Sequence, residues 1–165
     1  MIKQLRPSML STIKKFVTEL NSADDQDDFI HSDLQLAEAA LMYHVIAVDG
    51  VVKADEKKRM AEVLARHFDL DETETGNLTR DARNAENEAI DLYKFTSILK
   101  HTLTIEERNL IIEHLWEMVF ADGVVHELED NVVWRVAELL GVDSRERMVL
   151  KQKVWKRRSE ETGRN

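Results

Sequence analysis

Two segments of the chain repeat a short acidic pattern made of the residue types of a metal site. Asp49 and Asp122 each precede a glycine and two valines. A glutamate follows six residues after each glycine, at Glu56 and Glu129. Carboxylate oxygens suit Mg²⁺, Ca²⁺ and Mn²⁺ and leave softer metals without partners. If the two segments pack about a pseudo-twofold axis, the four carboxylates converge on one divalent cation. The candidate metal ligands are therefore Asp49, Glu56, Asp122 and Glu129.

Helix capping explains the same residues without a metal. Gly50 and Gly123 can each end a helix at positive φ, and the valine pair after each glycine is then expected to plug the turn into the core. Glu56 and Glu129 then fall in the first turn of the next helix, where each carboxylate stabilises the helix by about 0.3–1 kcal/mol. Capping is the simpler interpretation of each copy alone, and only convergence of the two copies requires a metal.

The spacing from glycine to glutamate also matches the second half of an EF-hand calcium loop. The first half is missing, because its first and third ligand positions are apolar in both copies. These positions hold Val45, Ala47, Met118 and Phe120. We therefore reject an ordinary EF-hand.

Other catalytic signatures are absent from the sequence. No cysteine occurs, which excludes disulfides, thiolate metal ligands and thiol redox chemistry. No His-Glu-x-x-His, glycine-rich phosphate loop or Gly-x-Ser-x-Gly is found, and no histidine belongs to the Glu-x-x-His pattern of di-iron bundles. We expect a non-enzymatic protein. The alternative is a metal-dependent enzyme that uses the four carboxylates on a phosphorylated or oxyanion substrate.

Three histidines are further candidate ligands. His44 and His114 lie within apolar helical stretches, where a partly buried structural role is the simpler interpretation. His126 lies inside the second acidic segment, but the matching residue of the first is Lys53, whose ammonium cannot coordinate a metal.

The elements that position these residues are all predicted to be helices. One proline, five glycines and apolar residues at helical spacing leave no strand signal. We expect an amphipathic helix after Pro7, an acidic loop at residues 21–28, and a second helix that opens at the capping box Ser32–Gln35. Five further helices lie between Asp55 and Leu140, and a basic helix opens at Asp143.

The predicted fold is thus one all-α bundle of seven to eight helices. Residues 1–28 form the amphipathic helix and the acidic loop, residues 29–157 the main domain, and residues 158–165 a basic, disordered tail. No apolar run approaches the roughly 18 residues of a membrane span. The polar residues near the N-terminus leave no room for the apolar region of a signal peptide, so we expect a cytoplasmic protein.

Residues 47–56 align with residues 120–129 at a spacing of 73, and Tyr43 aligns with Trp116. This alignment predicts an internal duplication of a helix–Asp-Gly–helix unit. The doubled pattern resembles the tellurite resistance protein B (TerB-like) family, over about residues 33–155. That family is related to the N-terminal cytoplasmic domain of DjlA-type co-chaperones. The resemblance implies an all-helical bundle, an association with tellurite and other stress resistance, a divalent-metal role for the acidic residues, and no established enzymatic activity.

The charge distribution points to the expected partners. The net charge is −9, but residues 23–144 alone carry −17. Such a surface repels nucleic acid and favours cations or basic partners, so we expect a protein partner or self-association and no nucleic acid. The basic run at residues 151–158 is expected to dock on the acidic middle of its own chain. Peripheral membrane contact through the basic terminal helices is a less favoured alternative.

Overall fold

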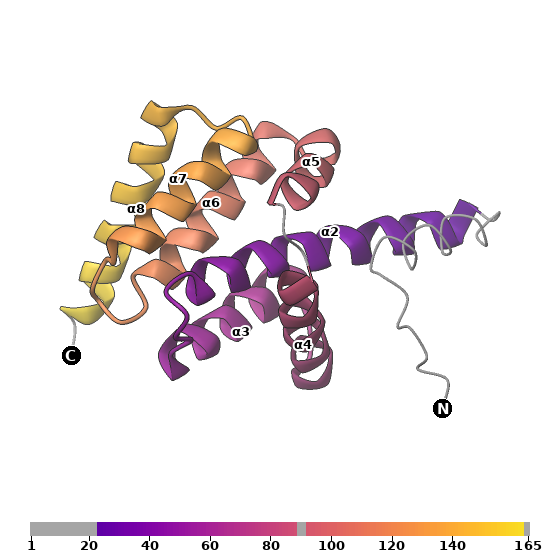
Figure 1. The fold of residues 1–165 in the computed structure, drawn as a ribbon, viewed down its shortest axis with the longest axis horizontal. Coiled ribbons are helices and arrows are strands. Elements are labelled where there is room, and N and C mark those ends of the chain that lie inside the picture. Colours follow the sequence, from indigo (N-terminus) through magenta and orange to yellow (C-terminus); the bar gives the residue numbers. More distant parts are fainter. Residues whose placement is uncertain (1–22, 89–91, 164–165) are drawn as a thin grey trace.

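The computed structural model describes residues 23–88 and 92–163, which form seven α-helices and no strand (Figure 1). The predicted all-α fold is confirmed for this part of the chain. The amphipathic helix expected after Pro7 lies outside the described residues. The helices are α2 (Ala23–Ala47), α3 (Ala54–Phe68), α4 (Glu72–Glu88), α5 (Leu92–Thr102), α6 (Ile105–Val119), α7 (Glu127–Leu139) and α8 (Ser144–Thr162).

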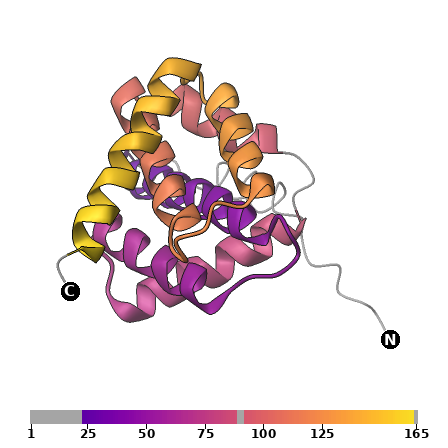
Figure 2. The ribbon, with the colours of Figure 1, turned by 90° about the vertical axis from the view of Figure 1, so that its left-hand side faces the viewer.

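Two groups of three helices make up the bundle. In the first group α2, α3 and α4 contact one another, and in the second group α6, α7 and α8 do the same. The groups meet where α2 packs on α6, with α3 against α6 on one side and α7 against α2 on the other (Figure 2). Helix α5 joins the groups and contacts α2 and α7. Each contact within the first group thus has a counterpart in the second, and the internal duplication itself stays a prediction.

The core lies along the two central helices, α2 and α6. The buried face of α2 includes Leu41 and Ile46, and α6 contributes Leu115 and Trp116. Burial of such side chains stabilises the fold by roughly 1.5–3 kcal/mol each. Tyr43, which the sequence aligns with Trp116, is also buried. None of the described helices combines the length and the apolar character that crossing a bilayer requires.

Helix ends follow the sequence closely in the second half of the chain. Thr104 caps α6, its Oγ1 accepting the amide of Glu107 at 3.3 Å while the Glu107 carboxylate accepts the amide of Thr104 at 2.8 Å. The Asp143 carboxylate caps α8 by accepting the Glu146 amide at 2.8 Å. Gly141 follows α7 at a φ of 71°. These three boundaries are confirmed.

The acidic loop expected at residues 21–28 is wrong from Ala23 onward, because α2 begins there. The predicted capping box at Ser32–Gln35 therefore lies inside the helix. The acidic residues of this segment fall in the first turns of α2, where negative charge is favoured by the helix dipole. The same charges that suggested a loop thus suit a helix N-terminus.

The disordered tail predicted from residue 158 is also wrong up to Thr162, because α8 continues to that residue. Contacts with the rest of the bundle hold this last part of the helix. The guanidinium of Arg158 donates to the backbone carbonyl of Ala121. The preceding residue, Arg157, donates to Glu117 on α6 at 3.0 Å.

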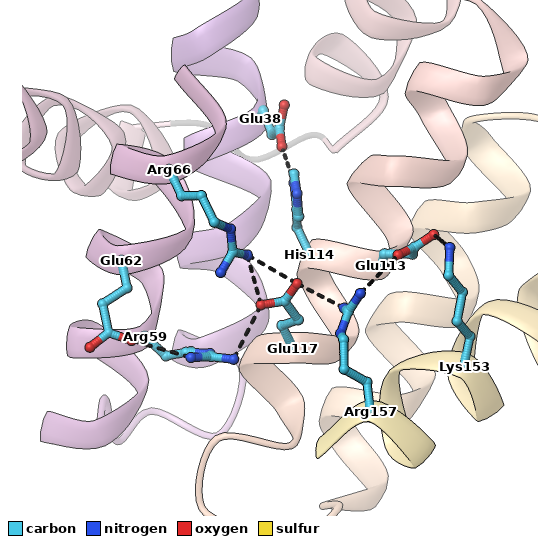
Figure 3. A network of polar contacts seen from close by, with 9 residues as sticks. All are labelled: Glu38, Arg59, Glu62, Arg66, Glu113, His114, Glu117, Lys153 and Arg157. Carbon is cyan, nitrogen blue, oxygen red and sulfur yellow. Dashed lines mark hydrogen bonds and ion pairs between the residues drawn. The ribbon is translucent and has the colours of Figure 1, made fainter. Parts of the chain in front are cut away.

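The basic face of α8 docks on buried acidic residues of α6, as expected from the sequence (Figure 3). Lys153 binds Glu113 at 2.7 Å, and Arg157 contacts both Glu113 and Glu117. From the other side, two arginines of α3 reach the Glu117 carboxylate, Arg59 at 3.3 Å and Arg66 at 3.0 Å. Glu117 therefore links α3, α6 and α8.

Candidate metal site at the two Asp-Gly corners

The first corner (residues 47–56) and the second corner (residues 120–129) have the same local conformation. Gly50 has a φ of 80° and Gly123 a φ of 78°. The amide of each glycine donates to the carbonyl three residues before it, at 2.9 and 3.0 Å. The positive φ explains why glycine stands at both positions, because other residues adopt it at a steric cost.

The two aspartates stabilise their own turns. The Asp49 carboxylate accepts the amide of Val51 at 2.9 Å, and the Asp122 carboxylate accepts the amide of Val124 at 3.0 Å. Bonds of this kind from an aspartate to the backbone two residues ahead are typical of Asx turns. Each aspartate therefore has a structural role in its corner.

The valines after each glycine do not plug the turn into the core as expected. Val51 is 62% exposed and Val124 55% exposed, and Val125 is exposed as well. Only Val52 packs partly against the core. Side chains alternate between two faces along extended backbone, so two consecutive valines cannot both point inward.

The glutamates of the two corners differ in their partners. The Glu56 carboxylate accepts the amide of Lys53 at 3.0 Å, which is the predicted capping role. Both carboxylate oxygens of Glu129 are buried without a hydrogen-bond partner. Capping therefore explains Glu56 and leaves Glu129 unexplained.

Glu56 and Glu129 lie next to each other although they belong to different corners. Their exposed fractions are 2% and 1%. Burial raises the pKa of Glu129 to about 8, and the hydrogen bond that a protonated Glu129 makes to the Glu56 carboxylate adds to this effect. Two buried carboxylates that lie against each other are not both ionised unless a cation joins them, and otherwise one of them holds a proton.

A lysine connects the second corner to this pair. The Lys53 ammonium lies 2.7 Å from the Asp122 carboxylate and 2.8 Å from Nε2 of His126. An ammonium only donates, so Nε2 of His126 accepts. The hydrogen bond to Asp122 raises the pKa of Lys53, and the negative charges of Glu56 and Glu129 raise it further.

Asp122 is an ionised partner in this arrangement. Burial raises its pKa, but hydrogen bonds from the Lys53 ammonium and the Val124 amide outweigh this effect and hold the pKa below its usual range. The structure thus brings Glu56, Glu129 and, through Lys53, Asp122 to the same junction. The fourth predicted ligand, Asp49, is exposed on the neighbouring loop.

A separate cluster was not predicted from the sequence. In the described part of the chain, three potential ligand atoms approach within 4.8 Å of one another at Glu38, His67 and His114. Of these three residues, the sequence indicates only His114, and it does so as a structural histidine. The three residues come from three helices, so no local spacing could have indicated the cluster.

A surface hollow of about 780 Å³ lies over α3 and α4. Lys57, Thr75 and Arg80 are among its lining residues, and the four motif carboxylates are not. This hollow therefore does not provide the substrate pocket that an enzyme would need beside the corners.

The comparison with protein families covers both corners. A family model described as tellurite resistance protein TerB matches residues 35–152. The chain belongs to the TerB family. The match extends from the middle of α2 into α8, so it includes both helix groups of this TerB chain. No curated protein and no solved structure matches it.

Proposed function

We propose that this TerB chain is a non-enzymatic module that binds one divalent cation at the junction of its two corners and a partner protein beside it. The observation that carries the proposal is Glu129, whose carboxylate is buried against Glu56 with both oxygens unpartnered. An oxygen-binding cation such as Mg²⁺, Ca²⁺ or Mn²⁺ replaces the proton that otherwise keeps this pair neutral.

When no metal is bound, the Lys53 ammonium supplies part of the positive charge that the cation would bring. Its ammonium neutralises Asp122 and lies in the field of Glu56 and Glu129. Its side chain is about one-third exposed, so it can turn outward and release Asp122. The cation then binds Glu56, Glu129 and Asp122, and Asp49 approaches from the adjoining loop.

The exposed apolar side chains around the corners support the partner. Each corner presents valines to solvent where the sequence leads one to expect buried residues. Exposed apolar groups that lie together often mark protein contact sites. A cation that joins the two corners would fix the relative position of these side chains and so couple metal binding to docking. The exposed residues are Val51, Val124, Val125 and Leu128.

Calorimetric titration of the metal-free chain with Mn²⁺, Mg²⁺ and Ca²⁺ tests the cation. We expect one equivalent to bind to the wild-type chain, and Glu129→Gln to lose most of the affinity because it removes a charged ligand without changing size. Asp49→Asn and Asp122→Asn should weaken binding. Asp71→Asn is the matched control, because Asp71 caps α4 by accepting the Glu74 amide, in the loop between α3 and α4. No heat of binding at millimolar metal contradicts the proposal.

We further propose that the corner site supports tellurite resistance, the activity named in the description of the family. A host that depends on this chain for growth on tellurite provides the test. The Glu129→Gln variant should fail to support growth, and the Asp71→Asn variant should support it. Equal growth with both variants, at equal protein levels, contradicts this role.

A further inference from the structure

Glu38, His67 and His114 lie on α2, α3 and α6, where the two helix groups meet. Glu38 is 3% exposed and His114 is 4% exposed, whereas His67 is half-buried. Figure 3 shows Glu38 and His114 pointing toward each other across the bundle. A polar group from each of three helices therefore converges where the two helix groups meet.

The distances suit coordination of one ion. His114 Nδ1 lies 2.8 Å from one oxygen of Glu38, and His67 Nε2 lies 3.4 Å from the other oxygen. The two imidazole rings meet edge to face with their centroids 4.6 Å apart. Ligands about 2.0–2.2 Å from a tetrahedral ion lie about 3.3–3.6 Å from each other. Small side-chain movements are enough to place all three ligand atoms around one metal.

The other half of the molecule shows that this interface does not require polar residues. At the spacing of 73 residues, the counterparts of the two buried members of the cluster are apolar and fully buried. Packing alone is therefore satisfied by hydrocarbon side chains at these two places. A carboxylate and an imidazole at the same places carry a desolvation cost, which a bound ligand offsets. The counterparts of Glu38 and His114 are Ile111 and Leu41.

The ionisation state of Glu38 agrees with a ligand role. Burial by itself raises its pKa, but hydrogen bonds from His114 and His67 outweigh burial and hold the pKa below the usual range. The carboxylate is therefore ionised at neutral pH. Both imidazoles turn a nitrogen toward it, and one metal ion can replace the protons that these nitrogens would otherwise carry.

We propose that Glu38, His67 and His114 bind one divalent transition-metal ion of the zinc type. Two imidazoles and a carboxylate suit zinc and its neighbours, whereas Mg²⁺ and Ca²⁺ prefer oxygen alone. The ion can enter from solvent at His67, which is partly exposed, and water takes the fourth coordination position. The ion joins α2 and α3 to α6 and so ties the two helix groups together. This site is independent of the corner site in its residues and its metal.

Titration of the untagged, metal-free full chain with Zn²⁺ and Co²⁺ tests the proposal. We expect one equivalent of Zn²⁺ to bind and raise the Tm, and Co²⁺ to give the visible absorption of a four-coordinate nitrogen and oxygen site. The triple variant Glu38→Ile, His67→Leu and His114→Leu copies the apolar counterparts of Glu38 and His114 and places a leucine at the half-buried His67, so it should fold. Its zinc affinity should fall by more than about 100-fold.

Two control variants separate this site from other effects. His101→Ala removes an exposed histidine of α5 and should leave zinc binding unchanged. Glu129→Gln should also leave it unchanged, so that failure of the corner site and failure of this site are distinguished. If the triple variant does not fold, His67→Leu alone replaces it, because that side chain is only half-buried. Absence of a cobalt spectrum in the wild-type chain, or unchanged zinc affinity in the ligand variant, overturns the proposal.

Discussion

Glu56 and Glu129 occupy equivalent positions in the two corners, but their surroundings assign them different roles. Glu56 accepts a backbone amide and caps α3, and Glu129 has no such partner. Because the two carboxyl groups are adjacent and buried, the proton on Glu129 is held more tightly in the folded chain than in the unfolded chain. The two glutamates therefore differ in their partners although their positions in the corners match.

The stability of the metal-free chain should depend on pH through Glu129. Its pKa is about 8 in the folded chain against an ordinary value of 4.5, so unfolding releases a proton between these values. The Glu129 contribution to stability is thus fully present below about pH 4.5 and lost as the pH rises through about 8. In urea denaturation with a chelator present, the wild-type chain should lose stability across this window relative to Glu129→Gln, whose amide is always neutral. If the free energy of unfolding depends on pH in the same way for both proteins, the pKa of Glu129 is not raised in the folded chain.

The corner glycines should tolerate alanine poorly. An added Cβ at Gly50 or Gly123 meets no atom within 4 Å, so the cost comes only from the positive φ and amounts to about 1–2 kcal/mol each. Gly76 is the matched control, since it lies inside α4 with equally open space. Gly76→Ala should instead stabilise the chain by about 0.5–1 kcal/mol. Chemical denaturation of the three variants measures the loss and the gain in the free energy of unfolding. If Gly50→Ala leaves this free energy unchanged, the positive φ of the turn carries no strain for alanine.

At the scale of the elements, side-chain caps fix the starts of α4, α6 and α8, and buried charges determine how α8 packs. Helices α6 and α8 begin where Thr104 and Asp143 cap them, and these starts were predictable from the sequence. The start of α2 was not, because an acidic stretch suits both a loop and the first turns of a helix. The end of α8 was missed since its tertiary contacts with Glu117 and Ala121 are invisible in the local sequence.

Glu117 should contribute more to stability than a typical acidic residue. It is buried and pairs with arginines of α3 and α8, so Glu117→Gln leaves these cations with a weaker partner. We expect a loss of about 1.5–3 kcal/mol in the free energy of unfolding. The exposed Glu62, which pairs with Arg59 within α3, is the control, and Glu62→Gln should cost no more than about 0.5 kcal/mol. Equal effects from the two substitutions would contradict the linking role of Glu117.

At the scale of the whole molecule, the matching residues of the two corners account for the part of the site that the sequence could predict. Glu56 and Glu129 hold matching positions in the two corners, and their carboxyl groups lie against each other in the bundle. The Lys53 ammonium of the first corner binds Asp122 and His126 of the second. The two corners differ here because the second has His126 where the first has Lys53. The cluster of Glu38, His67 and His114 depends on how three helices cross, which no periodic pattern encodes.

Lys53 should compete with the proposed metal. Its ammonium neutralises Asp122 and must leave before a cation can bind that carboxylate. Lys53→Met should therefore raise the affinity for Mn²⁺ by about tenfold, which corresponds to about 1.4 kcal/mol. Lys57→Met is the control, because Lys57 is exposed and lines the hollow over α3 and α4. Calorimetry compares the two variants, and an unchanged or lower affinity in Lys53→Met would argue against competition.

Crystals grown with Mn²⁺ give the most direct test of the corner site. Anomalous scattering locates manganese without reference to the protein model. The proposal predicts a single strong peak at the junction of the corners, about 2–2.6 Å from carboxylate oxygens of Glu56 and Glu129, with Lys53 turned away from Asp122. A structure at saturating Mn²⁺ in which this junction holds no anomalous peak and Lys53 still binds Asp122 would contradict it.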